Sequence, residues 1–203
     1  MSEAAQRTRY VLLARVPREI EVRIEDAFLT LVGTTRPLMG YHITLLGPFY
    51  LPSGVDYYAL KGIEQVCQNW PPFYVRLDGL GAFRSKDNNA IYIRLLEATE
   101  LVALHNALWA VLQNQIILQN EQTFRWNTQN YEPHITLGLG LLDEELEQLL
   151  HLGEERSLEE SFLVQEIWLA GQASDGPWQY LLRYPLGLTQ VSGKKEEQHP
   201  KKG

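Results

Sequence analysis

The chain has 203 residues, of which 45% are hydrophobic and 21% charged, a composition typical of a soluble globular protein. Its single cysteine, Cys67, excludes an internal disulfide and a multi-cysteine metal site. No window approaches 18 uninterrupted apolar residues, and the first ten residues lack the apolar segment of a secretory signal, so we expect a cytoplasmic protein without a membrane span. The net charge is −7, the segment 191–203 contributes +2, and the remaining body at −9 is a poor match for a long nucleic-acid duplex.

The first half of the chain is predicted to alternate strands and helices. An apolar stripe at Ile20, Ile24, Phe28 and Leu31 follows Pro17, which suits the first position of a helix. The predicted elements, in chain order, are a strand over 9–16, a helix from 17 that ends at 33, a strand over 41–47, a helix over 55–70, and strands over 73–83 and 90–95.

The second half repeats this order. It is predicted to contain a helix from 99, a long polar loop over 120–133, a strand over 134–139, a helix over 143–153, and strands over 162–170 and 178–184. We interpret the repeat as an internal duplication. It predicts an α+β, bilobal fold with pseudo-twofold symmetry, in which duplicated antiparallel sheets with flanking helices enclose a central cleft. One domain would span 1–190, with halves at about 9–97 and 98–190, and the polar tail 191–203 would be disordered.

The tetrapeptide His-Ile-Thr-Leu occurs twice, at 42–45 and at 134–137. Side chains two residues apart on a strand project from the same face. Since the Ile and Leu neighbours favour the core, each strand should present its His and Thr on the opposite face. Twofold symmetry would then bring four side chains together, from His42, Thr44, His134 and Thr136.

These four residue types favour acid–base chemistry on a phosphodiester. With an ordinary pKa near 6.5, one imidazole can be neutral and act as general base while the other is protonated and acts as general acid. The threonine hydroxyls can donate hydrogen bonds to non-bridging phosphate oxygens. This chemistry requires no metal and no cofactor.

The paired motifs and their flanks, Tyr41 to Phe49 and Pro133 to Leu137, resemble the 2H phosphoesterase superfamily. Within it, the similarity is to the bacterial 2′-5′ RNA ligase and RNA 2′,3′-cyclic phosphodiesterase branch, over residues 8–187. The resemblance implies a monomeric enzyme that acts on a nucleotide or RNA 3′ end bearing a 2′,3′-cyclic phosphate, or on a 2′-5′ linkage. An arginine often follows the second motif in this branch, whereas Gly138, Leu139 and Gly140 stand there in this chain.

Two arginines in similar loops are candidates to replace it. Arg36 lies six residues before His42 and Arg125 nine residues before His134, and a guanidinium can bind a phosphate in a forked geometry. Aromatic residues near the motifs could stack on a base, which holds a nucleotide without regard to sequence. The candidates are Tyr41, Trp126 and Tyr131, with Phe83 and Trp178 in addition.

Alternative functions stay open at this point. The same catalytic groups would serve the reverse reaction, an ATP-independent 2′-5′ joining of RNA ends. A nucleotide-binding or RNA-end-binding module without turnover would retain the pocket but not hydrolysis. The two histidines could instead bind a metal, which predicts inhibition by a chelator, but each is paired with Thr rather than with a carboxylate or Cys at ligand spacing. Of the other histidines, His105 is expected to be a partly buried helix residue.

Overall fold

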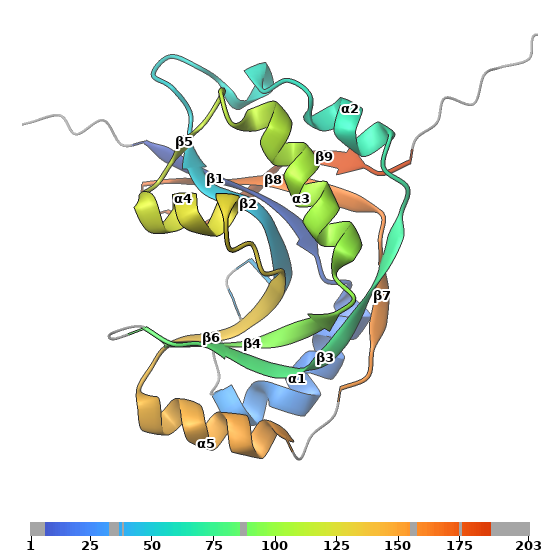
Figure 1. Cartoon of the computed structure of the whole chain (residues 1–203), viewed down its shortest axis with the longest axis vertical. Coiled ribbons are helices and arrows are strands. Elements are labelled where there is room, and N and C mark those ends of the chain that lie inside the picture. Colours follow the sequence, from blue (N-terminus) through green and yellow to red (C-terminus); the bar gives the residue numbers. More distant parts are fainter. Residues whose placement is uncertain are drawn as a thin grey trace, which may run out of the picture.

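The strands form a single antiparallel sheet that is curled into a half-barrel (Figure 1). The computed structural model describes residues 7–32, 37, 39–85, 89–154, 158–174 and 176–187, without the side chains of 29–32. The order of the strands across the sheet is β7-β3-β4-β6-β2-β1-β8-β9, and β5 pairs with β2. Their bounds are β1 Thr8–Arg15, β2 His42–Tyr50, β3 Phe73–Phe83, β4 Asn89–Leu96, β5 Ile117–Leu118, β6 His134–Leu141, β7 Ser161–Val164, β8 Glu166–Ala173 and β9 Gln179–Pro185.

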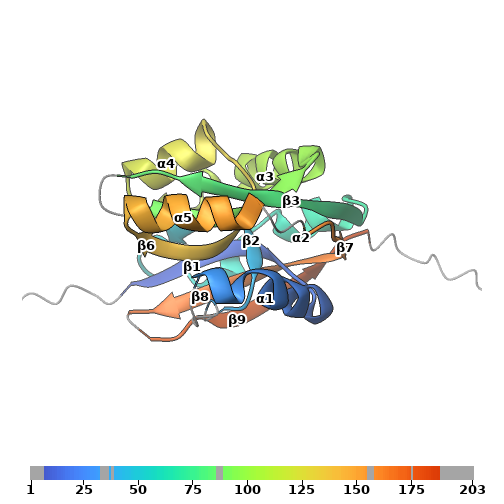
Figure 2. The same ribbon diagram turned by 90° about the horizontal axis from the view of Figure 1, so that it is seen from below.

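Helices cover two regions of this sheet. They are α1 Arg18–Val32, α2 Ile63–Gln68, α3 Thr99–Leu112, α4 Glu121–Thr128 and α5 Asp143–Glu154, with a short 3-10 helix at Tyr57–Ala59. Helices α1 and α5 contact each other and pack on β3, β4 and β6, as Figure 2 shows from below. Helices α2 and α3 pack together over β2 and β9. No helix in the described ranges is long and apolar enough to cross a membrane.

The two strands that carry the repeated tetrapeptide are neighbours at the middle of the sheet. Strand β2 pairs with β6, and four strands of the main strand order lie on each side of this junction, with β5 paired to β2 in addition. Beyond β2 come β1, β8 and β9, and beyond β6 come β4, β3 and β7. Each side of the sheet therefore contains strands from both halves of the sequence. The internal duplication, with its division at about residue 97, stays a prediction. The predicted tail 191–203 lies outside the described residues.

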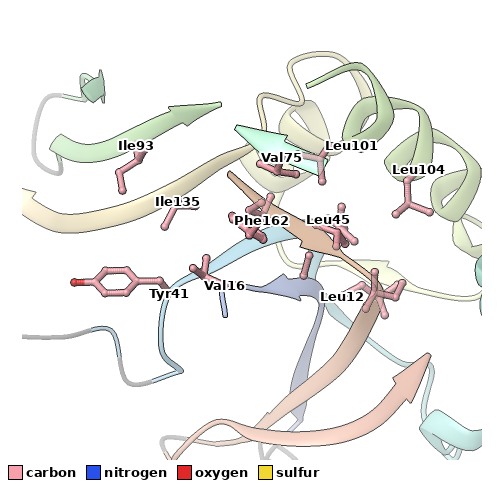
Figure 3. Close-up of a cluster of buried hydrophobic side chains, with 14 of the residues drawn as sticks. Leu12, Val16, Tyr41, Leu45, Val75, Ile93, Leu101, Leu104, Ile135 and Phe162 are labelled. Atoms are coloured by element: carbon pink, nitrogen blue, oxygen red, sulfur yellow. The ribbon is translucent and has the colours of Figure 1, made fainter. Parts of the chain in front are cut away.

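One hydrophobic core joins the two sides of the sheet. Ile20 and Ile24 of α1, Leu104 of α3, and Leu45 and Ile135 of the central strands all belong to a single buried cluster. Figure 3 shows part of this cluster, with side chains from strands on either side of the junction between β2 and β6. Because Leu45 and Ile135 point toward the helices, the alternate residues of β2 and β6 must point away from them.

Three predicted elements differ from the structure, and two of them lie in regions that contain helices. The helix expected over 55–70 is broken, because Gly62 adopts a left-handed conformation with φ +91°, and a Cβ there would lie 2.9 Å from Val111. The polar loop expected over 120–133 contains α4, whose first turn is capped by Asn120, which accepts a hydrogen bond from the backbone N–H of Thr123. Helix α4 lacks an apolar stripe because Asn127 is its one buried residue, and the hydrophobic pattern therefore did not predict it.

The strand expected over 162–170 is in fact two strands. Strand β7 ends at Val164 and pairs with β3, whereas β8 begins at Glu166 and pairs with β1. These two partners lie on opposite sides of the central junction. The chain thus passes from one side of the sheet to the other at Gln165, where Gln165 and Glu166 interrupt the apolar pattern.

Candidate active site

The repeated tetrapeptides place four polar side chains on one face of the sheet. Ile43 and Ile135 form the registered pair between β2 and β6, and both are 0% exposed in the core. Their neighbours on each strand project from the other face, which we call the histidine face. His42, Thr44, His134 and Thr136 are all partly exposed there, while Leu45 and Leu137 are buried. The alternation predicted from the sequence is confirmed.

The two imidazoles are held in the same way. Nδ1 of His42 lies 2.9 Å from the backbone oxygen of Gly40, and Nδ1 of His134 lies 2.7 Å from the backbone oxygen of Glu132. A carbonyl oxygen can only accept, so Nδ1 donates in each ring and carries its proton. The Nε2 atom is then the nitrogen that can gain or lose a proton, and each ring can act as base when neutral and as acid when protonated.

The surroundings favour the neutral form of both rings. Burial lowers the pKa of His42, against the opposing effect of its hydrogen bond to Gly40. Burial also lowers the pKa of His134; the hydrogen bond and the charge of Glu132 oppose this, and the charge of His42 adds to it. The two imidazoles are therefore close enough for the charge on one to disfavour the charge on the other, as a proton-transfer pair requires.

Three aromatic rings surround His134. The Phe83 ring lies 4.8 Å from it in an edge-on arrangement, the Tyr92 ring 5.0 Å and the Trp126 ring 6.4 Å. Phe83 also stacks on Tyr92 at 4.4 Å. Tyr92 needs Gly81 beside it, because a Cβ at that position would lie 2.7 Å from its ring.

Tyr92 was not among the residues predicted from the sequence. It lies opposite Thr136 in the pairing of β4 with β6, and its hydroxyl donates to Oε1 of Glu132 at 2.8 Å. Burial, with the hydrogen bond to Glu132, raises the pKa of Tyr92 to about 12. No sequence signal could identify Tyr92, because its position depends on the register of two strands that are far apart in the chain.

A buried histidine behind the site was also missed as a supporting residue. His105 is 1% exposed, with Nδ1 2.6 Å from the backbone oxygen of Leu45 and Nε2 2.8 Å from that of Asn127. Both partners are backbone oxygens, so the ring lies between two hydrogen-bond acceptors. It is fully buried rather than partly buried as expected, and it ties α3 to the first motif strand and to α4.

Tyr131 connects this histidine to the first motif. Its ring stacks on His105 with centroids 3.8 Å apart and planes at 9°, and its hydroxyl donates to the backbone oxygen of Thr44 at 3.1 Å. Burial raises the pKa of the Tyr131 hydroxyl. The side chain of Asn127 bonds to both the N–H and the oxygen of Gly47. The segment that precedes the second motif is thus fastened to the strand of the first.

Besides Phe83, only Trp126 among the residues predicted to bind substrate makes a ring contact with one of the two histidines in the described part of the chain. Tyr41 is 4% exposed in the core, because it precedes His42 by one residue and points to the Ile43 side, so it has no surface to offer a base. Arg36 lies outside the described residues. Arg125 is exposed on α4 and donates to Glu121 at 2.5 Å, so its guanidinium is paired within its own helix. Trp126 contacts both His134 and Tyr131, the latter at 5.0 Å, and stays a candidate wall of the site.

The described residues hold no group of three or more His, Cys, Asp or Glu side chains arranged to bind a metal ion. The donor set at the histidine face is two imidazoles and two hydroxyls. A zinc site of the usual kind would add carboxylate or thiolate ligands to the imidazoles. The chemistry of this donor set is better matched to proton transfer than to metal binding.

A family model described as the 2′-5′ RNA ligase superfamily matches residues 16–176. No curated protein sequence matches the chain. TT0787 of Thermus thermophilus is similar in structure, with 20% identity, a TM-score of 0.58, and coverage of 88% of this chain and 98% of that one. LigT of E. coli complexed with 3′-AMP has 19% identity, a TM-score of 0.56, and coverage of 89% and 98%. LigT complexed with ATP has 21% identity, a TM-score of 0.53, and coverage of 89% and 98%.

Proposed function

Because the chain belongs to the 2′-5′ RNA ligase superfamily, we propose that it is a metal-independent phosphodiesterase that uses His42 and His134 as an acid–base pair. Its substrates would be 2′,3′-cyclic phosphates of nucleosides or RNA ends, or 2′-5′ linkages. The observation that carries this proposal is the matched tethering of the two imidazoles, each with Nδ1 donating to a backbone oxygen two residues earlier. That arrangement leaves two Nε2 atoms on one face for proton transfer.

The reaction follows from the four side chains. One neutral imidazole removes a proton from an attacking water, whose oxygen forms a bond to phosphorus. The bond from phosphorus to the 2′ or 3′ oxygen breaks, and the second imidazole, protonated at Nε2, gives its proton to that oxygen. The hydroxyls of Thr44 and Thr136 donate to the non-bridging oxygens, which carry the negative charge throughout.

A nucleotide substrate is supported by the surroundings of His134 and by the structural relatives. Phe83 and Trp126, both half-buried, offer apolar rings next to the reacting centre, and stacking on such rings holds a base with little sequence preference. LigT of E. coli has been crystallised with 3′-AMP, NADP+ and ATP, so a related fold accommodates nucleotides. The acidic body of this chain is more compatible with such a ligand than with a long duplex.

The first test is hydrolysis of a nucleoside 2′,3′-cyclic phosphate by the wild-type protein in the presence of EDTA. We expect turnover at the same rate with and without the chelator, and a single nucleoside monophosphate as product. Loss of activity in EDTA that added metal restores would contradict the metal-independent mechanism. If neither this substrate nor a 2′-5′ dinucleotide is cleaved, the proposed hydrolysis is wrong, and joining of RNA ends is the reaction to assay.

The pH dependence of the rate gives a second prediction. The reaction needs one imidazole neutral and one protonated, so the rate should rise with pH as the base loses its proton and fall again as the acid loses its own. Since burial lowers both pKa values below 6.5, both arms move to lower pH, and the maximum of kcat/KM is expected on the acid side of pH 6.5. A flat profile from about pH 5 to pH 8, with chemistry rate-limiting, would contradict the two-histidine pair.

A further inference from the structure

An arginine lies directly opposite each histidine of the site. Arg15, the last residue of β1, pairs in register with His42, and Arg94 of β4 pairs in register with His134. Cross-strand partners project from the same face with Cβ atoms about 4.5–5.5 Å apart, so both arginines lie on the histidine face. The two positions are equivalent in the order of the strands, because β1 and β4 each flank a motif strand.

Only one of these arginines is free to bind a ligand. Arg94 donates from Nε to the backbone oxygen of Asp78 at 2.9 Å and lies 3.7 Å from its carboxylate. Arg15 makes no ion pair with any described residue. Its guanidinium instead lies 4.6 Å from the ring centroid of Tyr180 and 5.7 Å from that of Trp168.

The two rings under Arg15 are themselves fixed. Trp168 donates from Nε1 to Glu166 at 2.8 Å, and the Tyr180 hydroxyl donates to the backbone oxygen of Met39 at 2.6 Å. The second carboxylate oxygen of Glu166 accepts from Arg183, so this nearby acid is already paired. The guanidinium of Arg15 is thus held on an aromatic platform with its N–H groups available, and a planar fork of such donors matches phosphate geometry.

The platform lies to one side of the reacting centre. Trp168 belongs to β8 and Tyr180 to β9, which are the second and third strands from β2. With strands about 4.8 Å apart, β8 is on the order of 10 Å from the strand that carries His42 and Thr44. The guanidinium of Arg15 lies against rings of β8 and β9, on the other side of β1 from the motif strand, so it is positioned for an anionic group beside the reacting phosphate.

We propose that Arg15, held by Trp168 and Tyr180, binds a second phosphate of the substrate, next to the phosphate that reacts. This inference rests on the proposed function, and it narrows the substrate class to an oligonucleotide end rather than a mononucleoside cyclic phosphate. The reacting phosphate lies between the histidines and threonines, and the preceding internucleotide phosphate lies against Arg15. Arg15 places one positive charge at this position, although the net charge of the chain is negative.

The test compares two substrates that differ by one phosphate. A dinucleotide that ends in a 2′,3′-cyclic phosphate and the corresponding mononucleoside cyclic phosphate are assayed with wild type, Arg15→Gln, Arg15→Lys and the matched control Arg94→Gln. We expect Arg15→Gln to lower kcat/KM for the dinucleotide by about 10- to 100-fold, mainly through KM, as expected for loss of a charge-assisted hydrogen bond. The mononucleoside substrate should change less than about twofold, and Arg94→Gln should leave the ratio between substrates unchanged.

Binding measurements separate this proposal from the proposed function. Calorimetry with a dinucleotide 3′-phosphate and a nucleoside 3′-monophosphate, on the same variants, needs no turnover. Tighter binding of the dinucleotide that Arg15→Gln removes would support the subsite even if no hydrolysis were found. The proposal is overturned if wild type binds both ligands equally or binds neither, if Arg15→Gln weakens both alike, or if Arg94→Gln has the same effect. Because Arg15 is exposed at the end of a strand, circular dichroism should show all variants folded.

Discussion

Replacing His42 or His134 with alanine is expected to lower kcat/KM for 2′,3′-cyclic phosphate hydrolysis by about 10²- to 10⁴-fold, the usual contribution of a positioned general acid or base. The two variants should lose similar amounts of activity, because both imidazoles act in the same chemical step. Each ring is held in place by its own hydrogen bond, so neither can take over the role of the other. The measurement is initial-rate kinetics on a nucleoside cyclic phosphate, with the fold checked by circular dichroism. Both side chains are partly exposed on the histidine face, so little stability should be lost.

A matched control is available on the surface. His151 lies on α5, where it is mostly exposed and pairs with Glu154 at 3.7 Å, and His151→Ala should retain wild-type activity. The shape of the pH profile adds a second criterion. Each active-site variant should lose one arm of the bell, since one titrating group remains. If one of the two variants keeps near wild-type kcat/KM, a mechanism with two essential histidines is wrong.

The central part of the fold could be predicted because two sequence signals agree there. In each tetrapeptide, period-2 alternation predicts a strand, and the Ile and Leu positions predict which face is buried. The structure confirms both, with Ile43 and Ile135 paired in the core. The same alternation also determines the position of Tyr41, which precedes His42 by one residue and is therefore in the core; its aromatic character suggested a role in base stacking that its position in the strand does not permit.

The remainder of the site could not be predicted, since it depends on pairing between distant segments. Tyr92 and Arg15 reach the histidine face through the registers of β4 with β6 and of β1 with β2. Nothing in the local sequence of either strand indicates its neighbour. His105 and Asn127 are polar residues whose partners include backbone groups of other elements, and the sequence gives no signal for a backbone partner. Helix α4 was missed for a related reason, because polar contacts rather than an apolar stripe hold it.

The two histidines make the same kind of hydrogen bond to the backbone, but their surroundings differ. His134 has the rings of Phe83, Tyr92 and Trp126 around it. An arginine lies opposite each histidine, but only Arg15, opposite His42, makes no ion pair with a described residue. An apolar ring favours a base or sugar, and a guanidinium favours a phosphate. A symmetric pair of motifs can therefore bind an asymmetric substrate in one direction. The nucleoside would lie on the β6 side, and the rest of the oligonucleotide would extend over β1.

Removing the hydroxyl of Thr44 or Thr136 should be the next most damaging change. The variants Thr44→Val and Thr136→Val keep the shape and the strand preference of threonine but lose the donor. A single lost donor to a charge-bearing oxygen typically costs about 10²- to 10³-fold in kcat, and the double variant should fall further. The measurement is kcat and KM on the cyclic phosphate, together with the pH profile, which should keep both arms because the histidines remain.

Serine and a distant threonine provide the controls for this prediction. Thr44→Ser and Thr136→Ser retain a hydroxyl and should restore most of the lost rate, since the donor rather than the methyl group is required. Thr128→Val removes a hydroxyl that donates to the backbone oxygen of Phe124 on α4, and it should leave kcat unchanged. Full activity in both valine variants would show that the threonines only fill space on the strands. The charge of the reacting phosphate would then have to be held by other groups on the histidine face.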